Sequence, residues 1–249
     1  MTQKMSLSKI PDFHKNSYTL TMIYYNSQTI ISQLTHAHLS RVIAESLIIT
    51  DLSTNLILPL AIACHYHDHG WKTWEENPST HPHTQHPLDF QEIDPTTHIK
   101  IWTQSREIAT TQHPLVGYLV SKHTIYLSNL RLNNTTDKTD STTLTKFQKN
   151  EIQHQESLRS KITRLPSQTE LKKLQHYLAI SDYISLMICL NTNHHETIIN
   201  NTPIKIHQNN HKVTISLPLK APLSYLLRGT SLKNKGPWTK QINIECLTE

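Results

Sequence analysis

Glycine is scarce in this chain, and the scarcity limits the folds that the chain can adopt. The 249 residues contain 4 glycines and 12 prolines. Glycine most readily adopts the positive φ angles of tight turns, so few glycines disfavour barrels and β-sandwiches and favour helices. The glycines, Gly70, Gly117, Gly229 and Gly236, also lie too far apart for a glycine-rich phosphate loop. The composition therefore predicts a mainly α fold.

Patterns of apolar residues divide the chain into three parts. Residues 1–17 are expected to be a flexible N-terminal extension. Residues 18–192 begin with a small hairpin around Asn26-Ser27 and continue with helical spacing. Residues 193–249 contain short alternating, β-branched runs and are predicted to form a small β-rich appendage packed on the helical domain. The length and the 36% hydrophobic content suffice for one core with such an appendage.

Within residues 18–192, helical spacing recurs several times. Helices are expected from Gln33, from Pro59, over 98–110, 114–130 and 147–162, and after Pro166. Ser167 followed by Glu170 matches a capping box, which marks the start of the last of these helices. Two polar segments, 76–97 and 133–143, are predicted to be loops, and the second is predicted to be mobile.

Charge and composition exclude some partners. The formal net charge is +5 and the isoelectric point about 9.0. No marked cluster of basic residues with interleaved aromatics occurs, so nucleic acid is an unlikely partner, whereas a small anionic substrate is compatible with the charge. No segment is suited to a signal peptide or a membrane span, so we expect a cytoplasmic protein without a membrane partner. The distant Cys64, Cys189 and Cys246 do not indicate a disulfide framework.

The segment HYHDHGW, residues 65–71, contains the adjacent pair His67-Asp68. Such a dipeptide is common by chance, so the pair alone means little. The preceding residues LPLAIAC are apolar throughout, which places the pair at the end of a buried helix, where an unpaired aspartate is costly. A bound cation would remove that cost. His65 and His67 can face one ion only if the helix ends between them.

Asp182 and His36 extend this candidate site. Asp182 lies in LAISDYISLMICL, a strongly apolar stretch, and isolated buried aspartates are rare unless they are paired or bind metal. A capping, hydrogen-bonded or ion-paired aspartate is the alternative, and His36 could be an ordinary core or surface histidine. Together with His67 and Asp68 they form a set of imidazoles and carboxylates suited to a divalent transition metal: Mn, Fe, Co or Zn.

The ligand order, His36, then His67-Asp68, then Asp182, resembles the H…HD…D pattern of the HD superfamily. Further segments are similar to a bacterial family within the HD-like group, domain-of-unknown-function family 3891. These segments are QLTHAHLS (33–40), HDHGWKTWEENP (67–78), PLDF (87–90), HIKIW (98–102), PLVGYLVSKH (114–123), FQKNE (147–151) and SDYISLMICL (181–190). The resemblance implies an HD-type helical bundle as the fold.

The resemblance also implies further ligands. Some HD proteins carry two more histidines before the last aspartate and bind a second metal. His98, His113 and His123 are the candidates in this chain. His123 is the strongest and is counted as a fifth metal ligand, whereas His113 stands where an acidic residue is expected.

Many HD proteins are metal-dependent phosphohydrolases, so the resemblance implies hydrolysis of a small phosphate ester or nucleotide. His123 or His98 would then transfer a proton, and Lys122 or Arg41 would neutralise the charge of the substrate. Two alternatives stay open. An HD-type di-iron oxygenase needs His98 or His113 at the centre together with His123, and a non-catalytic metal- or ligand-binding module needs neither. Beyond a small anionic substrate, the expected partner is at most a second copy of the chain, as a homodimer.

Overall fold

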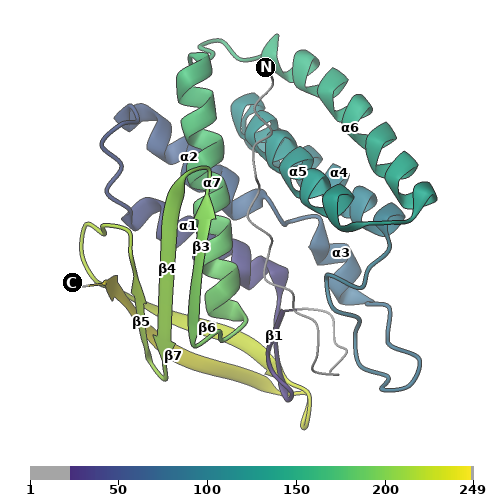
Figure 1. The fold of residues 1–249 in the computed structure, drawn as a ribbon, viewed down its shortest axis with the longest axis vertical. Helices are drawn as coiled ribbons and strands as arrows, with labels where there is room; N and C mark the ends of the chain where they lie inside the picture. Colours follow the sequence, from purple (N-terminus) through teal and green to yellow (C-terminus); the bar gives the residue numbers. More distant parts are fainter. Residues whose placement is uncertain (1–22, 248–249) are drawn as a thin grey trace.

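The computed structural model describes residues 23–247, in which a helical layer packs against a large curled sheet (Figure 1). About 52% of residues 23–247 is helical and 21% is strand. The prediction of a mainly α, HD-type bundle with a small hairpin and a small β appendage is therefore wrong. The expected extension, residues 1–17, lies outside the described residues.

The helices follow the order α1 (Gln33–Ser46), α2 (Ile57–Tyr66), α3 (Trp71–Glu76), α4 (Pro95–Gln112), α5 (Pro114–Asn134), α6 (Lys138–Arg159) and α7 (Gln168–Cys189). The predicted capping box is present, because the Ser167 hydroxyl accepts from the Glu170 amide while the Glu170 side chain accepts from the Ser167 amide. The predicted mobile loop 133–143 is wrong. Asp137 caps the first turn of α6, so this helix begins inside that polar segment.

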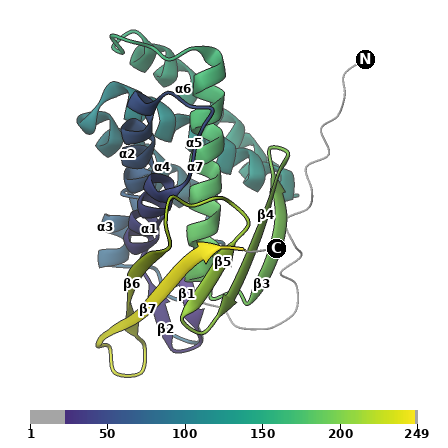
Figure 2. The same ribbon diagram turned by 90° about the vertical axis from the view of Figure 1, so that its left-hand side faces the viewer.

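The strands are β1 (Ile23–Asn26), β2 (Thr29–Ile31), β3 (His194–Ile199), β4 (Thr202–Asn209), β5 (Lys212–Ile215), β6 (Leu223–Ser231) and β7 (Pro237–Cys246). They form a seven-stranded sheet in the order β1-β2-β6-β7-β5-β4-β3, in which only the β5–β7 pair is parallel. Figure 2 shows this sheet curving around the lower half of α7.

The N-terminal hairpin and the C-terminal strands belong to the same sheet. β2 pairs with β6 through Thr29 opposite Ser231 and Ile30 opposite Thr230. The sheet thus crosses residue 192, where the sequence predicts the boundary between a helical domain and an appendage. That division into 18–192 and 193–249 stays a prediction.

Asparagine explains why the glycine argument underestimated the sheet. The β3–β4 turn places Asn200 and Asn201 at φ 45° and 69°, and the β4–β5 turn places Asn210 at φ 51°. None of the glycines within residues 23–247 has a positive φ. Asparagine tolerates the left-handed region because its short polar side chain can hydrogen-bond locally. Hairpin turns are therefore available to this chain without glycine.

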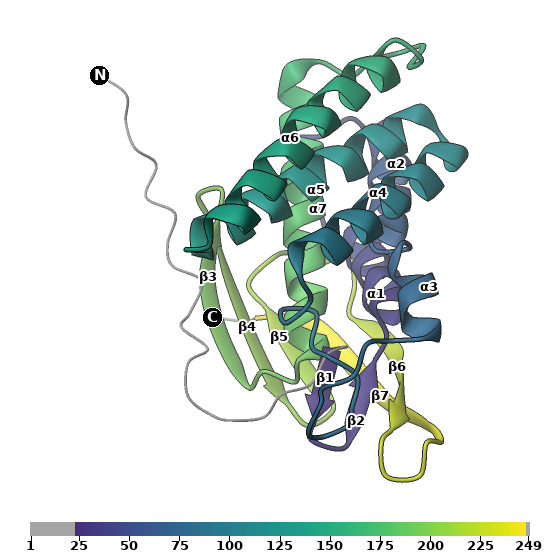
Figure 3. The same cartoon turned by 90° about the vertical axis from the view of Figure 1, so that its right-hand side faces the viewer.

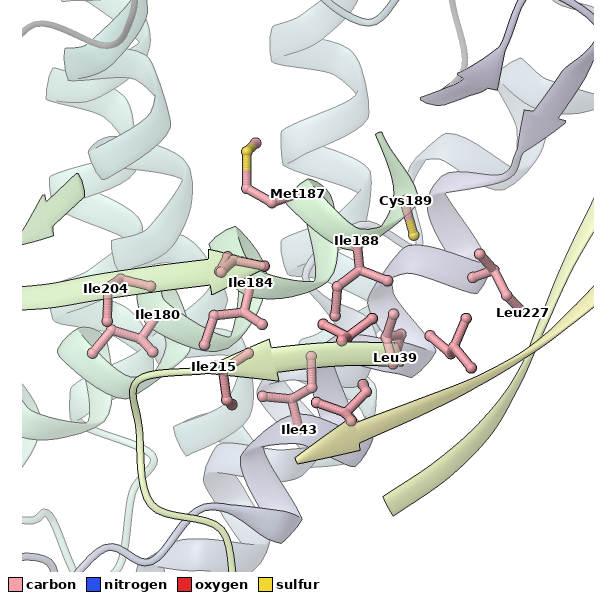
Figure 4. Close-up of a cluster of buried hydrophobic side chains, with 14 of the residues drawn as sticks. Leu39, Ile43, Ile180, Ile184, Met187, Ile188, Cys189, Ile204, Ile215 and Leu227 are labelled. Atoms are coloured by element: carbon pink, nitrogen blue, oxygen red, sulfur yellow. The ribbon is translucent and has the colours of Figure 1, made fainter. Parts of the chain in front are cut away.

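Helix α7 lies between two hydrophobic clusters. On one side, α1 and α7 pack against the concave face of the sheet, and Figure 4 shows the side chains that meet there. They include Leu39, Ile43, Ile180, Ile184, Ile188, Ile204, Ile215 and Leu227. On the other side, Leu174 and Leu178 join a second cluster with α2 and α5. Each fully buried Leu or Ile contributes roughly 1.5–3 kcal/mol, so both contacts strongly hold α7 in place.

The remaining helices complete the helical layer. Figure 3 shows α6 packed across α4 and α5. Within residues 23–247, no helix combines the length and the apolar character that a membrane span needs.

Gly70 allows α4 to approach the turn after α2 closely. A Cβ at this position would lie 2.0 Å from the Ile101 carbonyl oxygen and 2.8 Å from the Ser105 amide nitrogen. The Gly70 amide also donates to the Ser105 hydroxyl at 2.8 Å. Since backbone atoms cannot yield as a flexible side chain can, any larger residue displaces α4.

We predict that Gly70→Ala destabilises the fold by about 1–3 kcal/mol, the usual cost of overpacking. Gly236→Ala is the matched control, because its Cβ would approach nothing closer than the Asn234 side chain at 3.3 Å. Urea unfolding followed by circular dichroism measures both. Equal stability of the two variants would contradict the close approach of α4.

Candidate metal centre

Four helical elements bring the predicted ligands together. α1 contributes His36, the end of α2 contributes His67 and Asp68, α5 contributes His123, and α7 contributes Asp182. All of these residues are buried or nearly so: the three histidines and Asp68 are each at most 7% exposed, and the Asp182 side chain is 14% exposed. We call these five residues the buried cluster.

The ligand atoms of the buried cluster converge on Asp182. Its Oδ1 lies 2.8 Å from His36 Nε2 and 3.1 Å from His67 Nε2, and its Oδ2 lies 3.3 Å from His123 Nε2. Asp68 Oδ2 closes the group at 3.6 Å from His36 Nε2 and 3.3 Å from His67 Nε2. Two overlapping triads have ligand atoms within 4.8 Å of one another. These are His36, His67 and Asp68, and His67, His123 and Asp182.

The way in which α2 ends orients the side chains of His67 and Asp68 toward Asp182. The helix ends at Tyr66, and His67 is its C-cap. A tight turn follows, closed by the hydrogen bond from the Trp71 amide to the Asp68 carbonyl at 3.1 Å. The helix thus ends between His65 and His67. His65 stacks edge-on against other histidines, His38 and His69, instead of joining the cluster.

Hydrogen bonds behind the cluster fix the tautomers of two histidines. His67 Nδ1 lies 2.7 Å from the Cys64 carbonyl oxygen, which can only accept, so Nδ1 carries the hydrogen. The Ser185 hydroxyl donates to the Asp182 carbonyl at 2.8 Å and therefore accepts from His36 Nδ1 at 2.9 Å. In the neutral rings both Nε2 atoms thus present lone pairs to the carboxylates, which is the orientation of metal-binding histidines.

This arrangement fits a bound cation. Neutral Nε2 lone pairs and carboxylate oxygens all accept, so their convergence requires protons or a metal ion between them. His123 Nε2 is buried and has no hydrogen-bond partner among the described residues, which leaves it free for coordination. The ligand set of imidazoles and carboxylates suits Mn, Fe, Co or Zn.

Without metal, protons fill this role. Burial alone would lower the pKa of His67, but Asp68 and Asp182 outweigh it and raise that pKa well above its ordinary value. Burial opposes ionisation of Asp182, yet the charge of His67 and the close approach of the His123 and His36 imidazoles hold the pKa of Asp182 well below its ordinary value. A metal ion that binds here would therefore release protons.

His98 lies outside the buried cluster. The Arg131 guanidinium donates to His98 Nδ1 and to the Ile93 carbonyl. The imidazole stacks on Trp102 with ring centres 4.9 Å apart, and burial followed by Arg131 lowers the pKa of His98 to about 3. Its ring is therefore neutral, with the hydrogen on Nε2, which is a donor and not a ligand atom.

Other sequence candidates also point elsewhere. His113 is the N-cap of α5, and its Nδ1 accepts from the Leu115 amide at 3.1 Å. The Lys122 ammonium group lies over the ring of Tyr118, 5.7 Å from its centre. Arg41 forms an ion pair with Glu45 at 2.9 Å along α1. The structure brings none of these three candidates to the buried cluster.

Glu75 and Ser185 are neighbours of the cluster that the sequence analysis missed. The Glu75 carboxylate accepts from the Gln33 amide at 2.5 Å and so holds the first turn of the helix that carries His36. Burial, with a smaller effect of Asp68, raises the pKa of Glu75 to about 8. Ser185 lies one helical turn after Asp182, a spacing that could have indicated a supporting role.

A cavity of about 320 Å³ lies away from the cluster, between α4 and α6. Its walls include the buried ion pair of Arg106 and Glu151, whose closest atoms are 3.5 Å apart. None of the residues of the buried cluster lines this cavity. The cavity therefore does not give access to the candidate metal centre.

Comparison with known proteins yields a family and no named activity. The profile of the family described as "Protein of unknown function (DUF3891)" matches residues 22–218. No curated protein and no solved structure matches the chain.

We predict that Glu75→Gln stabilises the metal-free protein increasingly as the pH rises from about 5 to 8. The folded chain holds on Glu75 a proton that the unfolded chain, with an ordinary pKa of 4.5, releases. Rising pH therefore favours unfolding of the wild type through this group, whereas glutamine cannot ionise and still accepts from Gln33. Melting temperatures in chelator test this. Glu76→Gln, on the exposed side of α3, should show a constant difference, and the same constant difference in Glu75→Gln would contradict the prediction.

Proposed function

The chain belongs to the DUF3891 family, and we propose that it is a metal-dependent phosphohydrolase that acts on a small phosphate ester or nucleotide. The observation that carries this proposal is the convergence of five ligand side chains, with the tautomers of His36 and His67 set by Ser185 and the Cys64 carbonyl. A structural ion pair does not need three imidazoles around one carboxylate.

The bound ion would be Mn, Fe, Co or Zn, held by His36, His67, Asp68, His123 and Asp182. Such an ion lowers the pKa of a bound water and polarises a phosphoryl oxygen, which is the chemistry that ester hydrolysis requires. The ligand order along the chain resembles that of the HD superfamily. Membership of that superfamily is part of the proposal.

For His98 we propose a role other than the proton transfer or second-metal binding that the sequence analysis expects. With its Nδ1 occupied by Arg131 and its pKa near 3, it stays neutral at physiological pH. We assign it a hydrogen-bond donor function toward a phosphate oxygen, through Nε2–H. It is too weak a base to accept the proton of a metal-bound water.

The apolar surroundings can exclude water from the reaction. Trp71 packs edge-on against His98, with ring centres 5.4 Å apart. Ile93 and Phe90, from the loop between α3 and α4, pack on the same cluster as Trp71. In this proposal these residues form a wall beside the metal, and the loop admits the substrate.

The di-iron oxygenase alternative loses its main support. That hypothesis needs His98 or His113 at the centre together with His123. Within residues 23–247, His123 alone of the three joins the buried cluster, since His98 faces Arg131 and His113 caps α5. Hydrolysis with one ion is therefore the function that the geometry favours.

We predict that the metal-loaded protein hydrolyses at least one member of a panel of nucleotides and sugar phosphates. Asp68→Asn and Asp182→Asn should each lose the metal and reduce hydrolysis at least about 100-fold, because each removes a charged ligand. Asp140→Asn, in the first turn of α6, is the control and should keep both properties. Mn, Co, Fe and Mg are each supplied, and metal content and released phosphate are both measured.

Three outcomes would contradict the proposal. Metal retained by wild type without hydrolysis of any panel member would favour a non-catalytic binding module. Absence of metal from the wild type at saturating Mn, Co or Fe would refute the metal centre itself. Two irons per chain after anaerobic preparation would favour oxygenase chemistry instead.

We also predict that Ser185→Ala weakens metal affinity about 10- to 100-fold, the usual effect of removing a group that orients a ligand. Without the hydroxyl, His36 Nδ1–H loses its acceptor and the ring can rotate. Ser181→Ala is the matched control, since Ser181 is equally buried on α7 and no hydrogen bond to His36 or His67 is found for it. Competition with a fluorescent zinc chelator measures the affinities, and equal affinities would refute the orienting role.

A further inference from the structure

A second group of metal-ligating side chains lies on the hairpin of β3 and β4. His194 and His207 are directly opposite each other in the antiparallel ladder. Their ring centres are 4.3 Å apart, and their Nδ1 atoms are 3.2 Å apart. Two imidazoles are therefore held side by side by backbone pairing and not by flexible loops.

Glu196 completes this group. It lies two residues after His194, so the alternation of a strand places both side chains on the same face. Its Oε1 is 3.6 Å from His194 Nε2. One ligand atom from each of His194, Glu196 and His207 lies within 4.8 Å of the others. We call these three residues the hairpin triad.

The hairpin triad faces away from the buried cluster. His195, between the first two members of the triad, is only 8% exposed and packs on Tyr183 of α7. The side chains of His194 and Glu196 point to the opposite face and are 55% and 50% exposed. The triad therefore lies on the convex face of the sheet, open to solvent, and cannot share an ion with the helices.

We propose that the hairpin triad is an exchangeable site for a transition metal ion such as Cu²⁺, Ni²⁺ or Zn²⁺. Imidazole nitrogen is a preferred ligand of these ions, and three protein ligands with an open position for water are typical of reactive zinc sites. The strand pairing fixes the separation of the imidazoles before binding, so little conformational entropy is lost on coordination. The site is independent of the function proposed above.

Lys205 limits the affinity of this site. It lies opposite Glu196 in the ladder, and its ammonium nitrogen is 3.4 Å from Glu196 Oε1. A metal ion must displace this ammonium group to bind the carboxylate. Because both charges are exposed, the competing ion pair is weak and the ion can displace it.

Titration of the full-length protein with Cu²⁺, followed by electron paramagnetic resonance, tests the site. The expected difference between wild type and His194→Ala is one Cu²⁺ equivalent bound through two nitrogens, and His207→Ala should lose the same signal. Any Cu²⁺ bound in the buried cluster contributes the same signal to the wild type and to both variants, so it cancels in the difference. His154→Ala, at an exposed position on α6, is the matched control and should retain the signal.

Lys205→Ala tests the metal site without changing either histidine, so its effect on Cu²⁺ affinity cannot arise from a structural role of those histidines. It should strengthen Cu²⁺ binding about two- to fivefold, the range that an exposed ion pair can contribute. Thermal melts of all variants establish that they are folded. Unchanged Cu²⁺ binding in His194→Ala would overturn the proposal. An equal loss of Cu²⁺ in His154→Ala would also overturn it, because it would show that the ions bind nonspecifically to many surface histidines. Weaker Cu²⁺ binding in Lys205→Ala would show that Glu196 is not a ligand of the site and would contradict the three-residue triad.

Discussion

The Asp182 carboxylate, buried among three imidazoles, is the interaction on which the helical layer depends. A buried charge of this kind is strongly unfavourable unless it is compensated, and here the compensating groups come from α1, the end of α2, and α5. The same contacts that could hold a metal therefore also fix how these helices meet α7. Because α7 in turn forms the core against the sheet, the charge of one side chain links both layers of the fold.

Part of the buried cluster could be predicted from sequence because its residues are exceptional in their local surroundings, whereas His123 was expected only from the family resemblance. Asp182 and the pair His67-Asp68 are polar residues in or next to apolar stretches, and this contrast is visible without a structure. Their supporting groups are ordinary residue types whose role arises only from long-range contacts, as for Glu75, which binds an amide 42 residues away. Lys122 lies outside the buried cluster for a geometric reason, since a residue next to His123 on a helix points about 100° away from it.

The helices were predictable, and the sheet was not, for related physical reasons. Helical periodicity is local, so α4, α5 and α7 follow from spacing and caps that can be read from the sequence. Strand pairing is not local, and β3 and β6 carry polar or irregular patterns that did not stand out. Counting glycines misled because Asn200, Asn201 and Asn210 supply the left-handed turn positions. In a chain rich in asparagine, glycine content is a poor measure of the capacity to form hairpins.

The pairing of β2 with β6 has a consequence during synthesis. Ile30 and its partner Thr230 are separated by 200 residues along the chain, which a ribosome takes roughly 10–40 s to add at about 5–20 residues per second. During that time α1 to α7 are translated, while the edge of β2 that later pairs with β6 has no partner. The helical layer can thus assemble first, and the sheet closes late around α7. Until then, the unpaired edge of β2 is open to mispairing with another strand.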